Sequence, residues 1–251
     1  MRSGRNPAIH LLSPVNLIRF LAIFVCLHLL LFRAGNAEAV VTHSGPISSH
    51  TTWSSTDIHQ VTGNVTVAAG VTLTIEPGTI VKFNSGTRLD INGVLYAVGT
   101  ESEKIVFTSY RDDSFDGDTN GDGFSSGQPG DWGYISFSDT VADSLTHLEY
   151  TIIRYGGSGS VGNVYIDSTD ISVRFSDISY GSSYGIYTYI SSPLIEGNTI
   201  AGNGNHGIYH YYTSSPVDRN NTITGNSNGI YVRYATPSIE GNTITGSSGW
   251  G

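Results

Sequence analysis

The chain has very little cysteine and methionine and few charged residues. Its 251 residues include one Cys and one Met, and only 13% are charged. Cys26 is the single cysteine and has no disulfide partner within the chain, so stability must come from buried apolar surface and hydrogen bonds. After residue 39, Gly, Asn, Ser and Pro interrupt every apolar run before it reaches the length of an ordinary helix. The sequence therefore indicates short strands and tight turns.

Basic residues are scarce as well. Lys and Arg number 12 against 21 Asp and Glu, which gives a formal net charge of −9. A surface with this excess of negative charge repels the phosphates of nucleic acids and the anionic headgroups of membranes. We therefore expect neither nucleic acid nor an anionic membrane surface as a partner.

The first 39 residues have the layout of a secretory signal peptide. Arg2, Arg5 and Arg19 precede an apolar run over 20–32, and small residues follow as far as Ala39. The apolar run is shorter than the roughly 20 residues that a membrane-spanning helix needs. We expect residues 1–39 to be removed on export. The mature protein would then be secreted, periplasmic or at the cell surface, without a membrane span.

Glycine and tyrosine are abundant, and they recur at a fixed spacing. The chain has 31 Gly and 15 Tyr. From residue 191 one sequence motif repeats almost three times: SSPLIEGNTIAGNGNHGIYHYYT, SSPVDRNNTITGNSNGIYVRYA and TPSIEGNTITGSSGWG. The glycines of the Gly-Ile-Tyr triplets are 22 residues apart, at Gly185, Gly207 and Gly229. A repeat of this length predicts a solenoid in which each coil stacks on the next.

Apolar and polar residues alternate within each repeat, as they do in strands. In GIYTYI the alternation places Ile186, Thr188 and Ile190 inside the coil. Stacking brings three isoleucines into one interior column: Ile200, Ile223 and Ile244. It also aligns three asparagines at a turn, where Asn tolerates a left-handed backbone: Asn198, Asn221 and Asn242. We interpret the asparagines as structural, with Asp177 at the same corner one coil earlier.

The pattern divides the mature chain into a lead-in segment over 40–60 and coils over 61–251. Residues 111–131, RDDSFDGDTNGDGFSSGQPGD, interrupt the coils with almost no apolar content, so we expect them to leave the stack as a loop. The last residues, TGSSGWG, stop halfway through a coil without a cap. The sequence therefore predicts that the solenoid is truncated here and that further coils follow residue 251.

The segments VTVAAGVTLTIEPGTIVKF, KIVFTS, GDWGYISF, LEYTIIRYGG and GNTITGNSNGIYV resemble those of secreted right-handed parallel β-helix proteins of the pectin-lyase-like class. The likeness covers about 61–251 and implies an all-β fold, a right-handed parallel β-helix with coils of about 22 residues. The closing repeats are also similar to those of the periplasmic copper-binding and the carbohydrate-binding β-helix families. This architecture carries many unrelated activities, so the resemblance predicts the fold and leaves the activity open.

Only the resemblance to the periplasmic copper-binding β-helix family implies copper. His206 and His210 are the histidines closest together on the coils, but their equivalents in neighbouring repeats are not histidines. No column of histidine ligands is predicted, so copper is disfavoured.

The insertion carries the most specific local signal, DGDTNGDG over 116–123. Oxygen donors on alternate residues before a glycine are what a calcium loop requires. Two registers fit, one ending at Gly121 and one at Gly123, and the second resembles the loops of dockerins and thrombospondin type 3 repeats. We expect a structural Ca²⁺ with the candidate ligands Asp116, Asp118, Asn120, Asp122 and Asp131. Asp112 and Asp113 are alternatives for completing the site, and a solvated acidic loop without an ion is the competing interpretation.

Tyrosines form the second candidate site. Tyr187, Tyr209 and Tyr231 recur every 22 residues, and Tyr189 and Tyr211 recur beside them. If these side chains face outward, they form a strip that stacks against the sugar rings of a polysaccharide or cell-surface glycan. The alternative is that stacked tyrosines stiffen one face of the solenoid and bind nothing.

A catalytic constellation is not predicted. A lyase needs a basic residue near the substrate and a hydrolase needs paired carboxylates, whereas four arginines are expected in different columns: Arg154, Arg174, Arg219 and Arg233. Glu196 and Glu240 are expected in turns at equivalent places. We therefore favour an exported, calcium-stabilised module that binds glycan. The alternatives are a polysaccharide lyase or glycoside hydrolase, and an adhesin or scaffold that binds protein.

Overall fold

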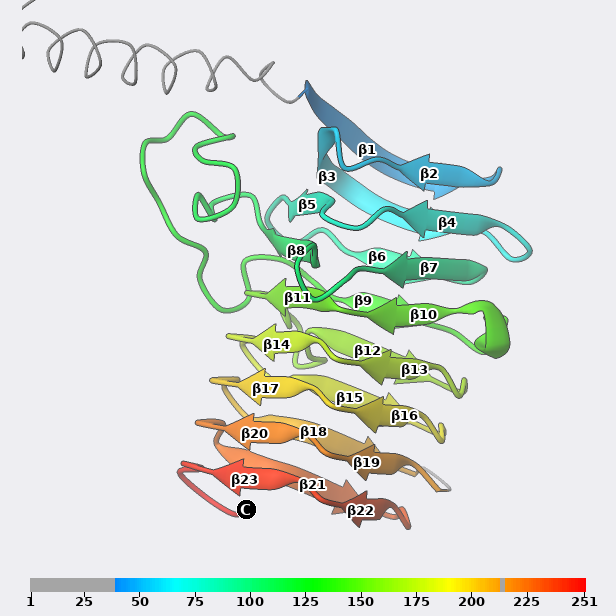
Figure 1. Cartoon of the computed structure of the whole chain (residues 1–251), viewed down its shortest axis with the longest axis vertical. Coiled ribbons are helices and arrows are strands. Elements are labelled where there is room, and N and C mark those ends of the chain that lie inside the picture. Colours follow the sequence, from blue (N-terminus) through cyan, green and yellow to red (C-terminus); the bar gives the residue numbers. More distant parts are fainter. Residues whose placement is uncertain (1–38, 213–214) are drawn as a thin grey trace, which may run out of the picture. The chain divides into compact units, whose positions relative to one another are not determined.

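The computed structural model describes residues 39–212 and 215–251. They form one compact unit, Ala39–Gly251, built almost entirely of short parallel strands (Figure 1). The predicted signal peptide, 1–39, lies outside the described residues except for Ala39, which begins the first strand. The chain winds through three strands per coil and then repeats, so each strand pairs with its equivalents in the coils before and after it. This is a parallel β-helix, as the all-β pattern and the repeat predicted.

Three strand stacks make up the walls of the helix. The first, here called sheet 1, contains the second half of β3 (Asp57–Val67), then β6 (Leu89–Ile91), β9 (Ile135–Phe137), β12 (Val164–Asp167), β15 (Ile186–Tyr189), β18 (His206–Tyr211) and β21 (Asn228–Arg233). Sheet 2 contains β2 (Thr51–Trp53), β4 (Thr72–Ile75), β7 (Val94–Val98), β10 (His147–Glu149), β13 (Ser172–Arg174), β16 (Leu194–Glu196), β19 (Val217–Arg219) and β22 (Ser238–Glu240).

Sheet 3 contains the first half of β3, then β5 (Ile80–Phe83), β8 (Ile105–Ser109), β11 (Thr151–Arg154), β14 (Asp177–Ser179), β17 (Thr199–Ala201), β20 (Thr222–Thr224) and β23 (Thr243–Thr245). The long strand β3 belongs to two walls because Ile58–Val61 pair with β5 and Val65–Val67 pair with β6. One short 3₁₀ helix, η1 (Asp143–Leu145), lies between β9 and β10.

The chain enters the stack earlier than the sequence pattern indicated. The segment 40–60 was expected to be a lead-in, but β1 (Ala39–Ile47) pairs in parallel with β3, and β2 pairs with β4. The alternation of buried and exposed residues in 40–60 is hard to recognise in the sequence. Two of the buried positions carry Trp53 and His59 instead of aliphatic residues. No helix among residues 39–212 and 215–251 is long and apolar enough to cross a bilayer.

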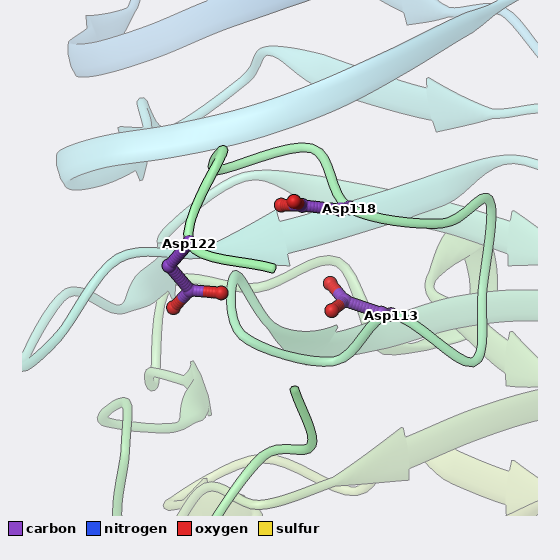
Figure 2. A group of neighbouring side chains, drawn as sticks. All are labelled: Asp113, Asp118 and Asp122. Carbon is purple, nitrogen blue, oxygen red and sulfur yellow. The ribbon is translucent and has the colours of Figure 1, made fainter. Parts of the chain in front are cut away.

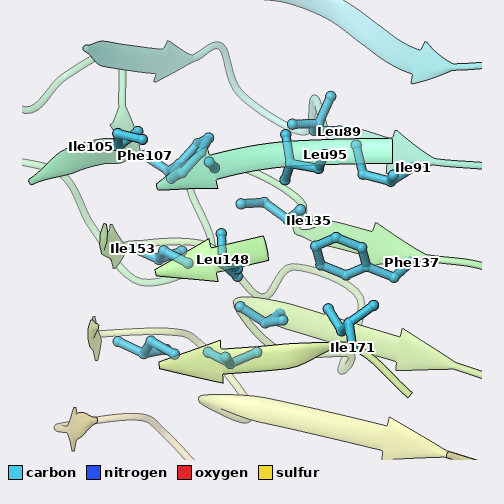
Figure 3. Close-up of a cluster of buried hydrophobic side chains, with 14 of the residues drawn as sticks. Leu89, Ile91, Leu95, Ile105, Phe107, Ile135, Phe137, Leu148, Ile153 and Ile171 are labelled. Carbon is cyan, nitrogen blue, oxygen red and sulfur yellow. The ribbon is translucent and has the colours of Figure 1, made fainter. Parts of the chain in front are cut away.

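Columns of aliphatic and aromatic side chains fill the centre (Figure 3). Ile186 pairs with Ile208 in the next coil. Ile200 pairs with Ile223, and Ile223 in turn pairs with Ile244. Ile200 and Ile223 are fully buried, which confirms the predicted isoleucine column. Each such side chain contributes roughly 1.5–3 kcal/mol by leaving water, so the stack needs no disulfide.

The repeated glycines are required by packing. A Cβ atom at Gly185 would lie 2.6 Å from the carbonyl oxygen of Gly207 and 2.6 Å from a methyl group of Ile200, and Gly207 is equally crowded against Ile223. No side chain fits in this gap. The Gly-Ile-Tyr triplet therefore marks a point where successive coils approach too closely for a side chain.

The asparagine column forms as predicted, but its first member is different. Asn198 donates from its amide nitrogen to the side-chain oxygen of Asn221, and Asn221 does the same to Asn242. One coil earlier the place belongs to Ser176, whose backbone N–H donates to the side chain of Asn198. The expectation for Asp177 was wrong, because it pairs with Thr199 one position further along.

Ile190 is also misplaced by simple alternation. Its backbone has a positive φ of 50°, and the side chain is 53% exposed instead of facing the core. Tyr212 and Tyr234, at the same corner in the next two coils, share the left-handed backbone. The strand ends at Tyr189, so period-two alternation stops one residue earlier than expected.

Candidate functional site: the tyrosine face and the acidic insertion

Sheet 1 carries a continuous column of tyrosines on its outer side. Tyr165, Tyr187, Tyr209 and Tyr231 pair in register along β12, β15, β18 and β21. Tyr189 and Tyr211 form a second column beside the first. The predicted five tyrosines therefore lie together on one wall of the β-helix. Their backbones alternate with the buried isoleucines of the same strands, which turns the rings away from the core.

Several aromatic residues extend this wall beyond the five that the spacing indicated. Tyr165 precedes Tyr187 by one coil, and the others flank the columns: Tyr184, His206, Tyr212 and Tyr234. Counting back 22 residues from Tyr187 finds Tyr165, and the same count links Tyr212 to Tyr234. We call all of these residues, together with Tyr187, Tyr189, Tyr209, Tyr211 and Tyr231, the tyrosine face.

The rings of this face stack mainly on one another. The ring centroids of Tyr187 and Tyr209 are 5.0 Å apart with planes only 9° from parallel, and those of Tyr165 and Tyr187 are 5.1 Å apart at 27°. Neighbouring rings therefore cover most of each other's faces, while edges and hydroxyl groups remain for solvent. More open rings occur at the rim, where Tyr231 is 40% and Tyr234 is 62% exposed. The geometry favours contact through hydroxyl groups over the broad stacking surface that the sequence suggested.

Burial raises the pKa of two hydroxyl groups in the first column, those of Tyr187 and Tyr165. It raises the pKa of Tyr187 to about 12, with smaller contributions from Tyr209 and the other nearby tyrosines. Burial also raises the pKa of Tyr165, helped by Asp167, to which the Tyr165 hydroxyl donates a 3.0 Å hydrogen bond. Every protonated phenol can donate one hydrogen bond and accept others. The face is thus a row of neutral donors and acceptors.

Charged groups occur only at the margins of the tyrosine face. Asp167 precedes Tyr189 in the second column, and Arg233 follows Tyr211 in it. The guanidinium of Arg233 lies 5.4 Å from the ring centre of Tyr211 and 5.2 Å from that of Tyr234. Arg233 also forms a hydrogen bond with Tyr209, and Asp167 accepts one from Tyr165. Between these charged groups, the neighbours that raise the pKa of Tyr187 are tyrosines, so this part of the face suits an uncharged ligand.

The acidic insertion lies between β8 and β9, and residues 111–131 contain no strand or helix. It brings three carboxylates together, those of Asp113, Asp118 and Asp122, with one oxygen from each within 4.8 Å of the others (Figure 2). Asp118 and Asp122 were candidate ligands, and Asp113 was one of the alternatives for completing the site. Asp116 lies outside this group.

Asp131 and Asn120 have other partners. The Asp131 carboxylate accepts hydrogen bonds from the Ser109 hydroxyl at 2.7 Å and from the Gln128 backbone at 2.8 Å, so it fastens the end of the insertion. The Asn120 side chain bonds to Asp122 through both its oxygen and its nitrogen. These contacts shape the loop around the three carboxylates.

Sheet 2 carries a column of alternating charge. Glu149, Arg174, Glu196, Arg219 and Glu240 follow one another in register. Glu196 receives Arg219 at 2.7 Å and Arg174 at 3.0 Å. The hydrogen bond from Arg219 is the main cause that lowers the pKa of Glu196.

This column corrects two expectations. Arg174 and Arg219 share one column instead of lying in different ones, and Glu196 and Glu240 lie in strands β16 and β22 instead of turns. Along the column an arginine separates each glutamate from the next, so neighbouring carboxylates do not form the pair that a hydrolase uses. The column stabilises the wall instead.

The two histidines considered for copper have separate surroundings. His206 stacks between the rings of Tyr184 and Tyr231, at 5.3 and 4.5 Å. His210 points into the core, where its Nε2 lies 2.8 Å from Asp218 and its Nδ1 lies 2.7 Å from the Thr188 hydroxyl. Sequence reasoning did not anticipate this internal network, and it does not bring the two histidines together.

The coils, the interior columns and the asparagine turn define the chain as a right-handed parallel β-helix protein. Residues 140–251 match a family model described as a right handed beta helix region. No curated protein and no solved structure matches the chain. The match covers β10 to β23 and includes the tyrosine face, and it assigns the architecture without assigning an activity.

Proposed function

We propose that the protein is an exported binding module whose tyrosine face holds an extended, uncharged glycan. The observation that carries the proposal is the in-register row of tyrosines on one outer wall, at Tyr165, Tyr187, Tyr209 and Tyr231. The predicted signal peptide over 1–39 supports a secreted, periplasmic or cell-surface location. A calcium ion in the insertion is expected to stabilise the module.

The chemistry of the row matches that of a sugar chain. Sugar hydroxyls both donate and accept hydrogen bonds, as phenol groups do. Asp167 and Arg233 contact the row at Tyr165 and Tyr209, and an uncharged ligand can hydrogen-bond to the hydroxyl groups without displacing either charged group. The exposed rims of Tyr231 and Tyr234 add apolar surface against which the C–H groups of a sugar can pack.

The spacing of the row supports a polymeric ligand. Ring centroids in the first column repeat every 5.0 to 5.3 Å along the β-helix, which is close to the spacing of adjacent strands. An extended polysaccharide presents equivalent hydroxyls at regular intervals along its axis. Such a chain lying parallel to the β-helix axis can therefore meet several tyrosines at once, and the contacts add through multivalency.

The test measures retention of the exported protein on a panel of insoluble neutral and acidic glycans. A triple variant, Tyr187→Phe, Tyr209→Phe and Tyr231→Phe, keeps the stacked rings and removes only three hydroxyls. At ~0.5–1.5 kcal/mol for each lost hydrogen bond, retention on the preferred neutral glycan should weaken at least about tenfold. Tyr96→Phe on sheet 2, where Tyr96 is 45% exposed, is the matched control and should bind like the wild type.

Three results would contradict the proposal. The first is a wild-type protein that no glycan of the panel retains. The second is a triple variant that is retained as strongly as the wild type, because the hydroxyl row would then have no role. The third is release of reducing ends or unsaturated products from the panel, which would make the protein an enzyme instead of a binding module.

A further inference from the structure

Asp113 presents an unusual combination of burial and missing partners. Its side chain is only 6% exposed. One carboxylate oxygen accepts a 2.5 Å hydrogen bond from the Ser125 backbone, whereas the other, Oδ1, has no hydrogen-bond partner. A buried carboxylate oxygen without a partner is costly, since burial removes the water that would stabilise the charge.

The carboxylates of Asp118 and Asp122 lie beside Asp113, and Figure 2 shows the side chains of Asp113 and Asp118 extending in the same direction, toward the side where Asp122 lies. Three negative charges at this distance repel one another unless a cation lies between them. The Asp118 carboxylate is held in place by the backbone N–H groups of Gly121 and Gly123, which donate to it at 2.6 and 2.9 Å.

Burial lowers the pKa of Lys82, and the nearby carboxylates, Asp113 above the others, oppose this lowering, but Lys82 makes no direct contact with Asp113. Lys82 is 1% exposed, and its ammonium group donates to the Gly117 carbonyl at 3.0 Å and to the Thr119 hydroxyl at 2.9 Å. Among the described residues it forms no ion pair with a carboxylate. Lys82, on β5, thus fixes the insertion at Gly117 and Thr119. It leaves Asp113 Oδ1 without a hydrogen-bond partner.

We infer that a divalent cation, calcium, binds between Asp113, Asp118 and Asp122. Asp113 is the ligand that links the start of the insertion to the turn over 118–122. Calcium accepts oxygen ligands in flexible arrangements, including carboxylates from an irregular loop. Magnesium requires a near-octahedral shell and keeps several waters. The inference deepens the proposed calcium stabilisation and does not depend on glycan binding.

The expected effect of the ion is local. The insertion is fastened to the β-helix without it, because Arg154 pairs with the buried Asp112 at 2.5 Å and Asp131 binds Ser109 at its other end. An ion at Asp113 would close the intervening segment, 113–122, into a ring. Removing calcium should therefore loosen the insertion while the stacked coils persist.

The experiment uses the whole exported chain, freed of metal with a chelator and then titrated with CaCl₂ in a calorimeter. We expect one ion per chain and affinity for Ca²⁺ at least tenfold above that for Mg²⁺. Asp113→Asn should lower the Ca²⁺ affinity at least tenfold. This variant is nearly isosteric and removes repulsion, so it should remain folded. Asp116→Asn changes an acidic residue of the same loop outside the group and should bind calcium like the wild type.

Limited proteolysis provides a second measurement. Calcium should protect the insertion of the wild type from cleavage, and it should not protect the insertion of Asp113→Asn. Absence of binding at millimolar Ca²⁺, equal binding of Mg²⁺, or a loss of binding in Asp116→Asn but not in Asp113→Asn would overturn the inference. Glycan retention measured with and without chelator separates this outcome from the glycan proposal, because the tyrosine face should still bind when the ion is absent.

Discussion

At the scale of single residues, His43 shows how burial controls charge at the first coil. Its ring stacks on Trp53 at 4.4 Å, and its Nε2 lies 2.8 Å from Nδ1 of His59. Burial, together with the neighbouring His59, lowers the pKa of His43 to about 4, and burial also lowers that of His59. A neutral His43 is therefore part of the folded state.

This arrangement predicts a pH dependence of stability. In the unfolded chain His43 binds a proton near its ordinary pKa of 6.5, whereas in the folded state it stays neutral down to about 4. Between these values the unfolded state binds more protons, so the free energy of unfolding should fall as the pH is lowered from 7 to 5. Urea unfolding at the two pH values measures this fall.

His43→Phe separates this effect from the titration of other groups. The phenyl ring can still pack on Trp53, but it cannot bind a proton, so the variant should lose less unfolding free energy between pH 7 and pH 5 than the wild type. Equal losses in the two proteins would show that His43 does not carry the effect.

The residue-scale features differ in how well the sequence predicts them. The tyrosine columns were predictable because a fixed spacing of 22 residues places equivalent side chains next to each other, and the isoleucine column was predictable because the Asn-Thr-Ile triplet repeats after 23 and 21 residues. Ile190 was not, because a positive φ at the end of a strand interrupts alternation and leaves no pattern of its own. Asp113 remained one alternative among three, because a loop has no period from which contacts can be read.

At the scale of elements, β18 and β19 carry a polar network inside an apolar column. His210 pairs with Thr188 and Val232 in the neighbouring strands, and Asp218 pairs with Ile195 and Ile239. His210 and Asp218 are both fully buried and bond to each other at 2.8 Å. One oxygen of Asp218 has no partner, so the network is less stabilising than an apolar pair would be.

Replacing His210 and Asp218 by the residues at the equivalent positions of a neighbouring coil, Val232 and Ile239, tests this interpretation. Asp218→Ile alone leaves His210 Nε2 buried without a partner and should destabilise the protein by about 1–3 kcal/mol. His210→Val added to Asp218→Ile removes both polar groups and should restore stability to at least the wild-type level. Thermal midpoints of the wild type, both single variants and the double variant form the cycle that measures the coupling.

The account would be wrong if the double variant were less stable than either single variant. That result would mean that the histidine and the carboxylate contribute more to the core than two aliphatic side chains in the same places.

Element positions were predictable where a repeated residue marks the column. The charge column of sheet 2 was missed because its members alternate between Arg and Glu, at Arg174, Glu196, Arg219 and Glu240, with uneven spacings of 22, 23 and 21 residues. The isoleucine column has the same uneven spacing, but the repeated Asn-Thr-Ile triplet marks it. A change of one residue at a corner moves every side chain to the opposite face if the register is assumed constant. Register assignment therefore needed the paired strands.

At the scale of the whole described unit, the three candidate features occupy different places. The tyrosine face lies on sheet 1, the alternating charges lie on sheet 2, and the insertion leaves the chain between sheet 3 and sheet 1 (Figure 1). In a solenoid each coil contacts mainly its neighbours. The ion and the glycan are therefore expected to act at separate places, the first on a loop and the second along a wall.

The central claim is that tyrosine hydroxyls of one wall contact a glycan. The most direct measurement is NMR of protein with ¹³C-labelled tyrosine rings, titrated with soluble neutral oligosaccharides derived from cellulose, chitin and mannan. The account predicts that at least one of them shifts the signals of Tyr165, Tyr187, Tyr209 and Tyr231, while Tyr96 on sheet 2 stays unchanged. Signals of these four tyrosines that do not respond to any of the sugars, or shifts confined to tyrosines of the other walls, would contradict it.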